Sequence, residues 1–149
     1  MTTTDLDAML LIAQAPDGII FADADGNVAF WNEAAARIFG HTPAEAMGQN
    51  LDMIIPEKFR DAHWRGFEHA MDSGETKYGG KALATKALHR DGSEIYVELS
   101  FSIVRNAEDA AIGALAHARD ITERFNADRE MRRRLRELEQ EREAKAAGA

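Results

Sequence analysis

Residues 94–104 contain the pattern that most restricts the fold of this chain. Apolar side chains occupy every second position, which is the period of a β-strand with one buried face. The alternating apolar residues are Ile95, Val97, Leu99, Phe101 and Ile103. Because one face of this strand must be buried, other elements of the chain have to cover it.

Four other segments predict strands. Residues 19–23 and 27–31 flank Asp25-Gly26, a hairpin signal, while residues 80–88 precede Arg90-Asp91-Gly92 and residues 111–120 come last. Short helices are predicted between the second and third strands. Asn32 caps one that Gly40 ends, Thr42 opens a single turn through a capping box, Asn50 caps another turn, and residues 56–72 form a longer helix. The order predicts an α+β fold with an antiparallel sheet.

The 56–72 helix places a histidine on its apolar face. Phe59, His63, Phe67 and Ala70 recur at helical spacing and are expected to form one inward stripe. A buried imidazole without a partner costs roughly 1–3 kcal/mol. His63 therefore needs a partner, which is either another protein group or a bound ligand.

The last strand has three alanines on one face, Ala114, Ala116 and Ala118. Small side chains there leave room for a ligand or for larger side chains from the helices. They are equally consistent with a helix packed tightly on the sheet. His41 and His89 fall in turns, where we expect solvated side chains.

Composition excludes several functions. The chain has no cysteine, so disulfides, thiolate metal sites and thiol nucleophiles are absent. Its net charge of −8 argues against nucleic-acid binding. No signal peptide or membrane-spanning run is apparent, so we expect a cytoplasmic protein. The sequence contains no recognisable nucleophile-plus-base arrangement, so we do not expect an enzyme.

The two ends of the chain differ from its centre. Residues 1–16 are predicted as an amphipathic helical segment, residues 17–122 as the main domain, and residues 123–149 as a long C-terminal helix with a sparse apolar stripe. That tail carries a net +1, so residues 1–122 carry about −9. An apolar stripe needs a partner, so we expect a homodimer formed through the terminal helices.

Residues 17–122 carry a series of short motifs: Asp25-Gly26 with Val28, Phe30-Trp31-Asn32-Glu33-Ala34-Ala35, Ile38-Phe39-Gly40, Glu45-Ala46-Met47-Gly48, Arg90-Asp91-Gly92 and Arg119-Asp120-Ile121-Thr122. In this order and spacing, they resemble the PAS family of sensor domains. The resemblance implies a PAS fold, in which a five-stranded antiparallel sheet has short helices on one face. It also implies a signalling role with a downstream kinase, cyclase or regulator, in the same parent chain or a separate one.

Within that family, residues 48–63 most resemble the haem-binding PAS domains of FixL-like and direct-oxygen-sensor proteins. The resemblance implies that His63 is the axial ligand of haem b iron, with His69 and Lys77 near the propionates. The other expected haem contacts are Phe59, Phe67, Leu83, Leu99, Ala116 and Ala118. Those sensors carry a distal Arg or Met where this chain has Leu83 and Lys81, so oxygen is not the first candidate gas.

Two alternatives remain beside haem. The first alternative is a cofactor-free module for dimerisation, protein interaction or small-metabolite sensing. The second is a redox sensor that binds flavin non-covalently. Light-oxygen-voltage domains and photoactive yellow protein depend on a pocket cysteine, which this chain lacks.

Overall fold

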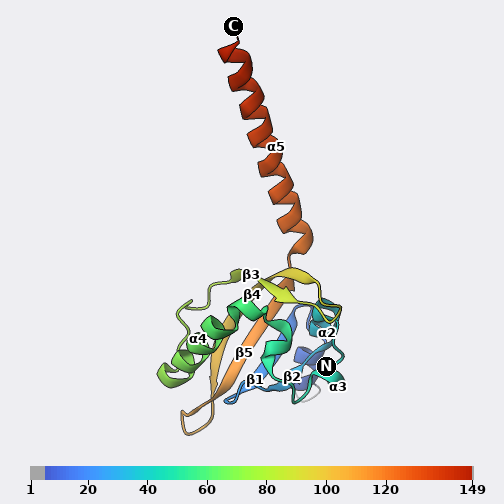
Figure 1. Ribbon diagram of the computed structural model, residues 1–149. Coiled ribbons are helices and arrows are strands. Elements are labelled where there is room, and N and C mark those ends of the chain that lie inside the picture. Colours follow the sequence, from blue (N-terminus) through green and yellow to red (C-terminus); the bar gives the residue numbers. More distant parts are fainter. Residues whose placement is uncertain (1–5, 149) are drawn as a thin grey trace.

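The computed structural model describes residues 6–148, and a five-stranded antiparallel sheet forms its centre (Figure 1). The strand order is β2-β1-β5-β4-β3. The strands are β1 (Gly18–Asp23), β2 (Val28–Trp31), β3 (Leu83–Leu88), β4 (Glu94–Arg105) and β5 (Ala111–Asp120). The predicted α+β class and sheet are confirmed.

The alternation in β4 places its apolar side chains on the inner face of the sheet. In the register of the sheet, Phe101 faces Ala116 across the β4–β5 pair, and Ala116 faces Ile20 on β1. Directly opposed residues share one face, so this row continues across three strands. The next row joins Leu83, Leu99 and Ala118.

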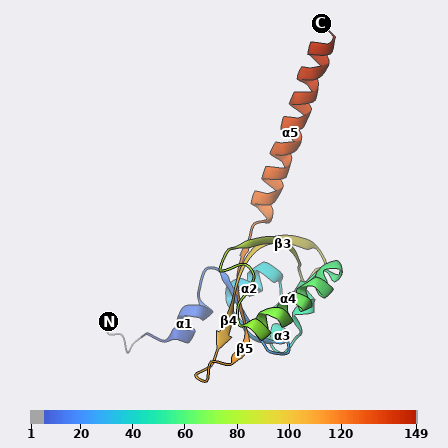
Figure 2. The same cartoon turned by 90° about the vertical axis from the view of Figure 1, so that its left-hand side faces the viewer.

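The elements between β2 and β3 cover the inner face, on the same side of the sheet (Figure 2). They are α2 (Glu33–Phe39), α3 (Pro43–Ala46), the 3₁₀ turns η2 (Leu51–Ile54) and η3 (Glu57–Phe59), and α4 (Arg60–Ser73). Three predicted caps are present: the side chains of Asn32, Thr42 and Asn50 each accept a backbone N–H at a helix start.

The core lies where α2 and α3 meet the sheet. Phe39 and Val97 are the largest side chains that are fully buried. Asn32 is the buried polar residue there, and its side chain both caps α2 and accepts from the N–H of Ile19. The same amide donates to the carbonyls of Ile12 and Asp17, which fixes the chain entering β1.

Two predicted boundaries are wrong. β3 begins at Leu83 rather than at residue 80, because Gly79 and Gly80 both have positive φ and turn the chain before the strand. The helix predicted from Pro56 begins instead with the 3₁₀ turn η3, and regular α-helix starts at Arg60.

One further helix precedes the sheet in the chain and another follows it. α1 (Ala8–Ala13) lies on the side of the sheet opposite α2 and α4 (Figure 2), and α5 (Thr122–Ala147) projects away from the domain. Residues 1–5 of the predicted N-terminal segment and Ala149 lie outside the described residues. Within residues 6–148, no helix is long and apolar enough to cross a membrane.

Candidate functional site

One wall of the candidate site is the inner face of β3, β4 and β5. The cross-strand row brings Leu83, Leu99 and Ala118 together, with Ala116 next along β5. Ala118 is buried, whereas Leu83, Leu99 and Ala116 are only half-buried. The wall is therefore apolar and incompletely covered.

α4 lies over the same face, toward the end of the sheet that carries the β1–β2 turn, and it is fixed near both of its ends. Near its start, the indole Nε1 of Trp64 donates to the Asp52 carboxylate at 2.7 Å, and the ring lies against Gly26 in the β1–β2 turn. At the other end, Arg105 of β4 donates to the carbonyl of Gly74 at 2.8 Å. The ten residues from Trp64 to Gly74 span about 15 Å, so α4 crosses the sheet from the β1–β2 turn to the end of β4.

His63 lies directly before the first anchor, Trp64, on the half-buried side of α4. Its ring packs edge-on against Trp64, with centroids 4.7 Å apart. Its Nδ1 is shielded from solvent and has no hydrogen-bond partner. Burial lowers the pKa of His63, and the nearby Asp52 carboxylate opposes that shift only in part. The group is thus a neutral imidazole, the form that binds metal ions.

The other residues predicted on α4 divide into two groups. Phe67 is half-buried, with its ring 6.2 Å from that of His63, and Ala70 is buried. Phe59, predicted on the same inward stripe, is instead 37% exposed. It belongs to the 3₁₀ turn η3, so the helical spacing that defines the stripe does not extend to it.

The two predicted propionate partners are exposed. His69 lies on an exposed position of α4, and Lys77 lies in the segment that follows the helix. The ammonium of Lys77 sits 5.1 Å from the centre of the neighbouring Tyr78 ring. Both side chains are exposed to solvent, and the structure does not bring them together with His63.

The small side chains of β5 allow α4 to lie against the strand, although Ala114 and Ala116 remain half-buried. α4 lies directly against β5, and Ala70 is its buried residue. Part of the chemistry of an iron porphyrin site is present, since His63 is a shielded imidazole without a partner on a helix that contacts β5. A planar macrocycle between α4 and β5 requires the helix to separate from the strand, because the two are in contact here.

Sequence reasoning missed the clamp formed by Trp64, Asp52 and Gly26. The Asp25-Gly26 turn was recognisable, but nothing local to it indicates that an indole covers it. His41 was also predicted wrongly as solvated: it is half-buried against Trp31, whose indole donates to the His41 carbonyl at 3.0 Å. Burial lowers the pKa of His41, and the Arg90 guanidinium lowers it further.

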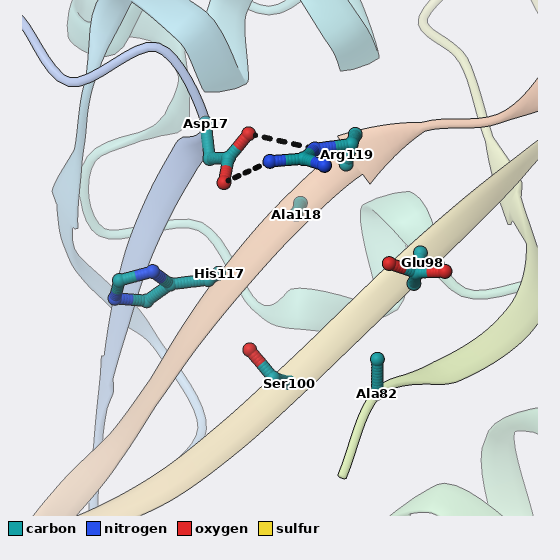
Figure 3. Close-up of a pocket in the computed structure, with 7 residues that line it drawn as sticks. All are labelled: Asp17, Ala82, Glu98, Ser100, His117, Ala118 and Arg119. Carbon is teal, nitrogen blue, oxygen red and sulfur yellow. Dashed lines mark hydrogen bonds and ion pairs between the residues drawn. The ribbon is translucent and has the colours of Figure 1, made fainter. Parts of the chain in front are cut away.

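A hollow of about 120 Å³ lies on the outer face of the sheet (Figure 3). Its charged groups are already paired: Asp17 with Arg119 at 3.1 Å, and Glu98 with Arg124 at 3.1 Å. His117 and Ser100 complete its rim, so His117 points away from the inner face. Among residues 6–148, no three His, Asp or Glu side chains are grouped to hold a metal ion.

The sequence profile described as the PAS fold matches residues 7–121. An oxygen sensor protein of Escherichia coli, DosP, is 29% identical over 103 residues, which are 69% of this chain and 13% of that protein. The sensor protein FixL of Bradyrhizobium diazoefficiens is 25% identical over 141 residues, 95% of this chain and 27% of that protein. This chain therefore spans about a quarter or less of the length of these relatives.

Solved structures share the fold. An RNA-binding light-oxygen-voltage receptor has a TM-score of 0.71 at 22% identity, covering 89% of this chain and 38% of that one. The PAS domain of a Colwellia psychrerythraea protein has a TM-score of 0.68 at 22% identity, covering 77% of this chain and 94% of that one.

Proposed function

The chain belongs to the PAS family, and we propose that it is a sensor module that binds haem b through His63. The observation that carries the proposal is the shielded, unpartnered Nδ1 of His63 together with its place on a helix that packs against β5. His41 also has a shielded nitrogen without a partner, but it lies in the turn before α3. An isolated buried imidazole costs stability, whereas an imidazole that ligates a metal recovers that cost. The similarity to an oxygen sensor and to FixL supports the same assignment.

Each residue then has a defined task. His63 would hold the iron through its imidazole, and the ring of Phe67, whose centre lies 6.2 Å from that of His63, would be its apolar neighbour. The apolar residues Leu83, Leu99, Ala116 and Ala118 would provide the apolar surface of the site, with Phe59 at its rim. The side chains of His69 and Lys77 would serve the propionates. Haem supplies reversible binding of a diatomic gas or a one-electron redox change.

The side chains at the start of β3 indicate which gas to propose as the signal. Leu83 is apolar, and Lys81 lies exposed in the turn before β3. A bound oxygen molecule depends on a hydrogen-bond donor more than carbon monoxide or nitric oxide does. We therefore propose carbon monoxide, nitric oxide or a redox change as the signal, in preference to oxygen.

Haem titration of the purified protein tests the proposal. The expected result is one haem per chain with a strong Soret band, which His63→Ala loses while its circular dichroism is unchanged. His117→Ala is the matched control, because that histidine lies on the outer face, and its spectrum should equal that of the wild type. A protein that takes up no haem contradicts the proposal, and a yellow protein with a flavin spectrum selects the flavin alternative.

The alternative with structural support is a cofactor-free module. The direct contact between α4 and β5 favours it, because a domain packed in this way needs no ligand to fill its inner face. In that case the same titration yields no Soret band. In either case we propose a binding module rather than an enzyme, without nucleic acid as its partner.

The proposed output is a homodimer that passes the signal through its terminal helices to a downstream partner. Exposed apolar residues at both ends support self-association, with Leu10 and Leu11 at 54% and 58% exposure on α1. The route from sheet to α5 is short: the N–H of Ile121 donates to the Tyr96 carbonyl at 2.9 Å, and the rings of Tyr96 and Phe125 stack at 3.7 Å. A ligand can shift this equilibrium only by its differential affinity for the two states.

Sedimentation of the full-length variants Leu135→Glu/Leu138→Glu and Met9→Glu/Leu10→Glu separates the two helices. Loss of the dimer in the first pair alone assigns self-association to α5, and loss in the second alone assigns it to α1. Dimers that persist in both variants contradict association through the terminal helices.

A further inference from the structure

α5 has an apolar stripe that nothing in the described chain covers. Every residue from 126 to 148 is exposed, and Met131, Leu135 and Leu138 are 66%, 55% and 58% exposed. Their spacing of four and three residues is that of a coiled-coil core. A stripe of this kind on a free helix indicates a helical partner.

The heptad of these residues defines six positions on one side of α5, which we call the α5 seam. In chain order the α5 seam consists of Asp128, Met131, Leu135, Leu138, Arg142 and Lys145. Three apolar positions therefore lie between an acidic residue on the N-terminal side and two basic residues on the C-terminal side. Residues beside the seam are also divided by charge: Arg132 and Arg134 precede Glu139 and Glu141.

A parallel pair of α5 helices stacks the three apolar positions on their own copies but opposes like charges at the three charged positions. Each seam position then meets its own copy, so Asp128 faces Asp128, Arg142 faces Arg142 and Lys145 faces Lys145. Like charges at facing positions are destabilising. Beside the seam, Arg134 meets Glu139 of the second copy, which gives two favourable pairs by symmetry.

An antiparallel pair places no like charges opposite each other in the seam. With Leu135 aligned to Leu138 of the second copy, Met131 aligns with Arg142 and Asp128 aligns with Lys145. The alkyl stem of Arg142 can cover Met131 while its guanidinium reaches water. Beside the seam, Arg132 meets Glu139 and Arg134 meets Glu141, which gives four favourable pairs by symmetry.

We propose that α5 binds α5 of a second copy in antiparallel orientation, with Leu135 packed on Leu138. The intrahelical pairs of Arg133 with Glu130 and Glu137 agree with this arrangement, because they lie on the side of α5 away from the seam. The two PAS domains then lie at opposite ends of the helix pair. The inference rests on the proposed self-association through the terminal helices and is independent of haem.

Disulfide trapping tests the orientation, since the chain has no cysteine of its own. Full-length Met131→Cys and Arg142→Cys are mixed in equal amounts and equilibrated in a glutathione redox buffer. In the antiparallel pair these positions face each other across the two chains, within the 4.4–6.8 Å Cα separation of a disulfide. In a parallel pair they are about 16 Å apart along the axis, and each faces its own copy.

The expected result is a mixed disulfide at least about tenfold more abundant than the two homodisulfides together. Predominant homodisulfides of Met131→Cys and Arg142→Cys would overturn the proposal in favour of a parallel pair. Glu130→Cys, which lies off the seam, is the control for random collisions. Trapping of the mixed pair no faster than this control overturns the proposal as well, and neither outcome bears on the haem spectrum.

Discussion

α2 and α4 cover the same face of one sheet, yet they are buried to very different degrees. On α2, Ala35 and Phe39 are 0% exposed. On α4, Ala70 is the buried residue, while His63 and Phe67 are half-buried. We call the α2 half the sealed core, because its inward side chains are fully buried. The α4 half is only partly packed and contains the imidazole of His63.

This difference separates the part of the domain that holds the fully buried core from the part that is only partly packed. Elements that open for ligands come from the less stable regions of a protein. α4 fits that description, because it is fixed mainly through Trp64 at its start and Gly74 after its end.

The largest effect should come from equivalent truncations in the two halves. Phe39→Ala should lower the free energy of unfolding by about 3–5 kcal/mol, because it leaves a cavity in the sealed core. Phe67→Ala should cost roughly half of that or less, since its ring is only half-buried. Urea denaturation measures both, and equal losses would remove the distinction between the halves.

The caps provide a second comparison. Asn32→Ala should cost about 2–3 kcal/mol, because the buried N–H groups of Ile19 and Ala35 lose their acceptor. Asn50→Ala removes a cap of the same type at an exposed site and should cost about 0.5–1 kcal/mol. If both variants unfold at the same urea concentration, burial does not determine the strength of these caps.

Local chemistry predicted most of the sealed half. Asn32 and Gly40 mark the ends of α2 from their own residue types, and β4 follows from its alternation. The α4 half depends on contacts between distant segments. Trp64 covers Gly26, and α4 rests on β5, and neither contact leaves a periodic signal in the sequence. The exposure of Phe59 has the same origin, since a 3₁₀ turn replaces the predicted helical turn.

The smallest effect concerns the stability cost of His63. His63→Leu should leave the free energy of unfolding unchanged or raise it by up to about 1 kcal/mol, because it replaces a shielded, unpaired nitrogen with an apolar group. His69→Leu, at an exposed site on the same helix, should have no effect. A loss above 1 kcal/mol in His63→Leu would show that the imidazole has a protein partner.

The pH dependence of stability gives an independent measure of the same burial. The pKa of His63 in the folded protein lies below its ordinary value of 6.5, so the unfolded chain takes up the proton first. As far as His63 is concerned, the free energy of unfolding is therefore highest above about pH 6.5 and falls as the pH drops below that value. His63→Leu should flatten this fall without abolishing it, since burial also lowers the pKa of His41. An unchanged slope in the variant would show that His63 is solvated.

Rescue by free imidazole tests the central claim, that the His63 ring itself is the haem ligand. His63→Gly removes the ring at a helix cost of about 1 kcal/mol and leaves space for a small molecule. We predict that this variant binds haem without the wild-type Soret band, and that adding imidazole restores the band. A variant whose haem spectrum equals that of the wild type before imidazole is added would contradict ligation by His63.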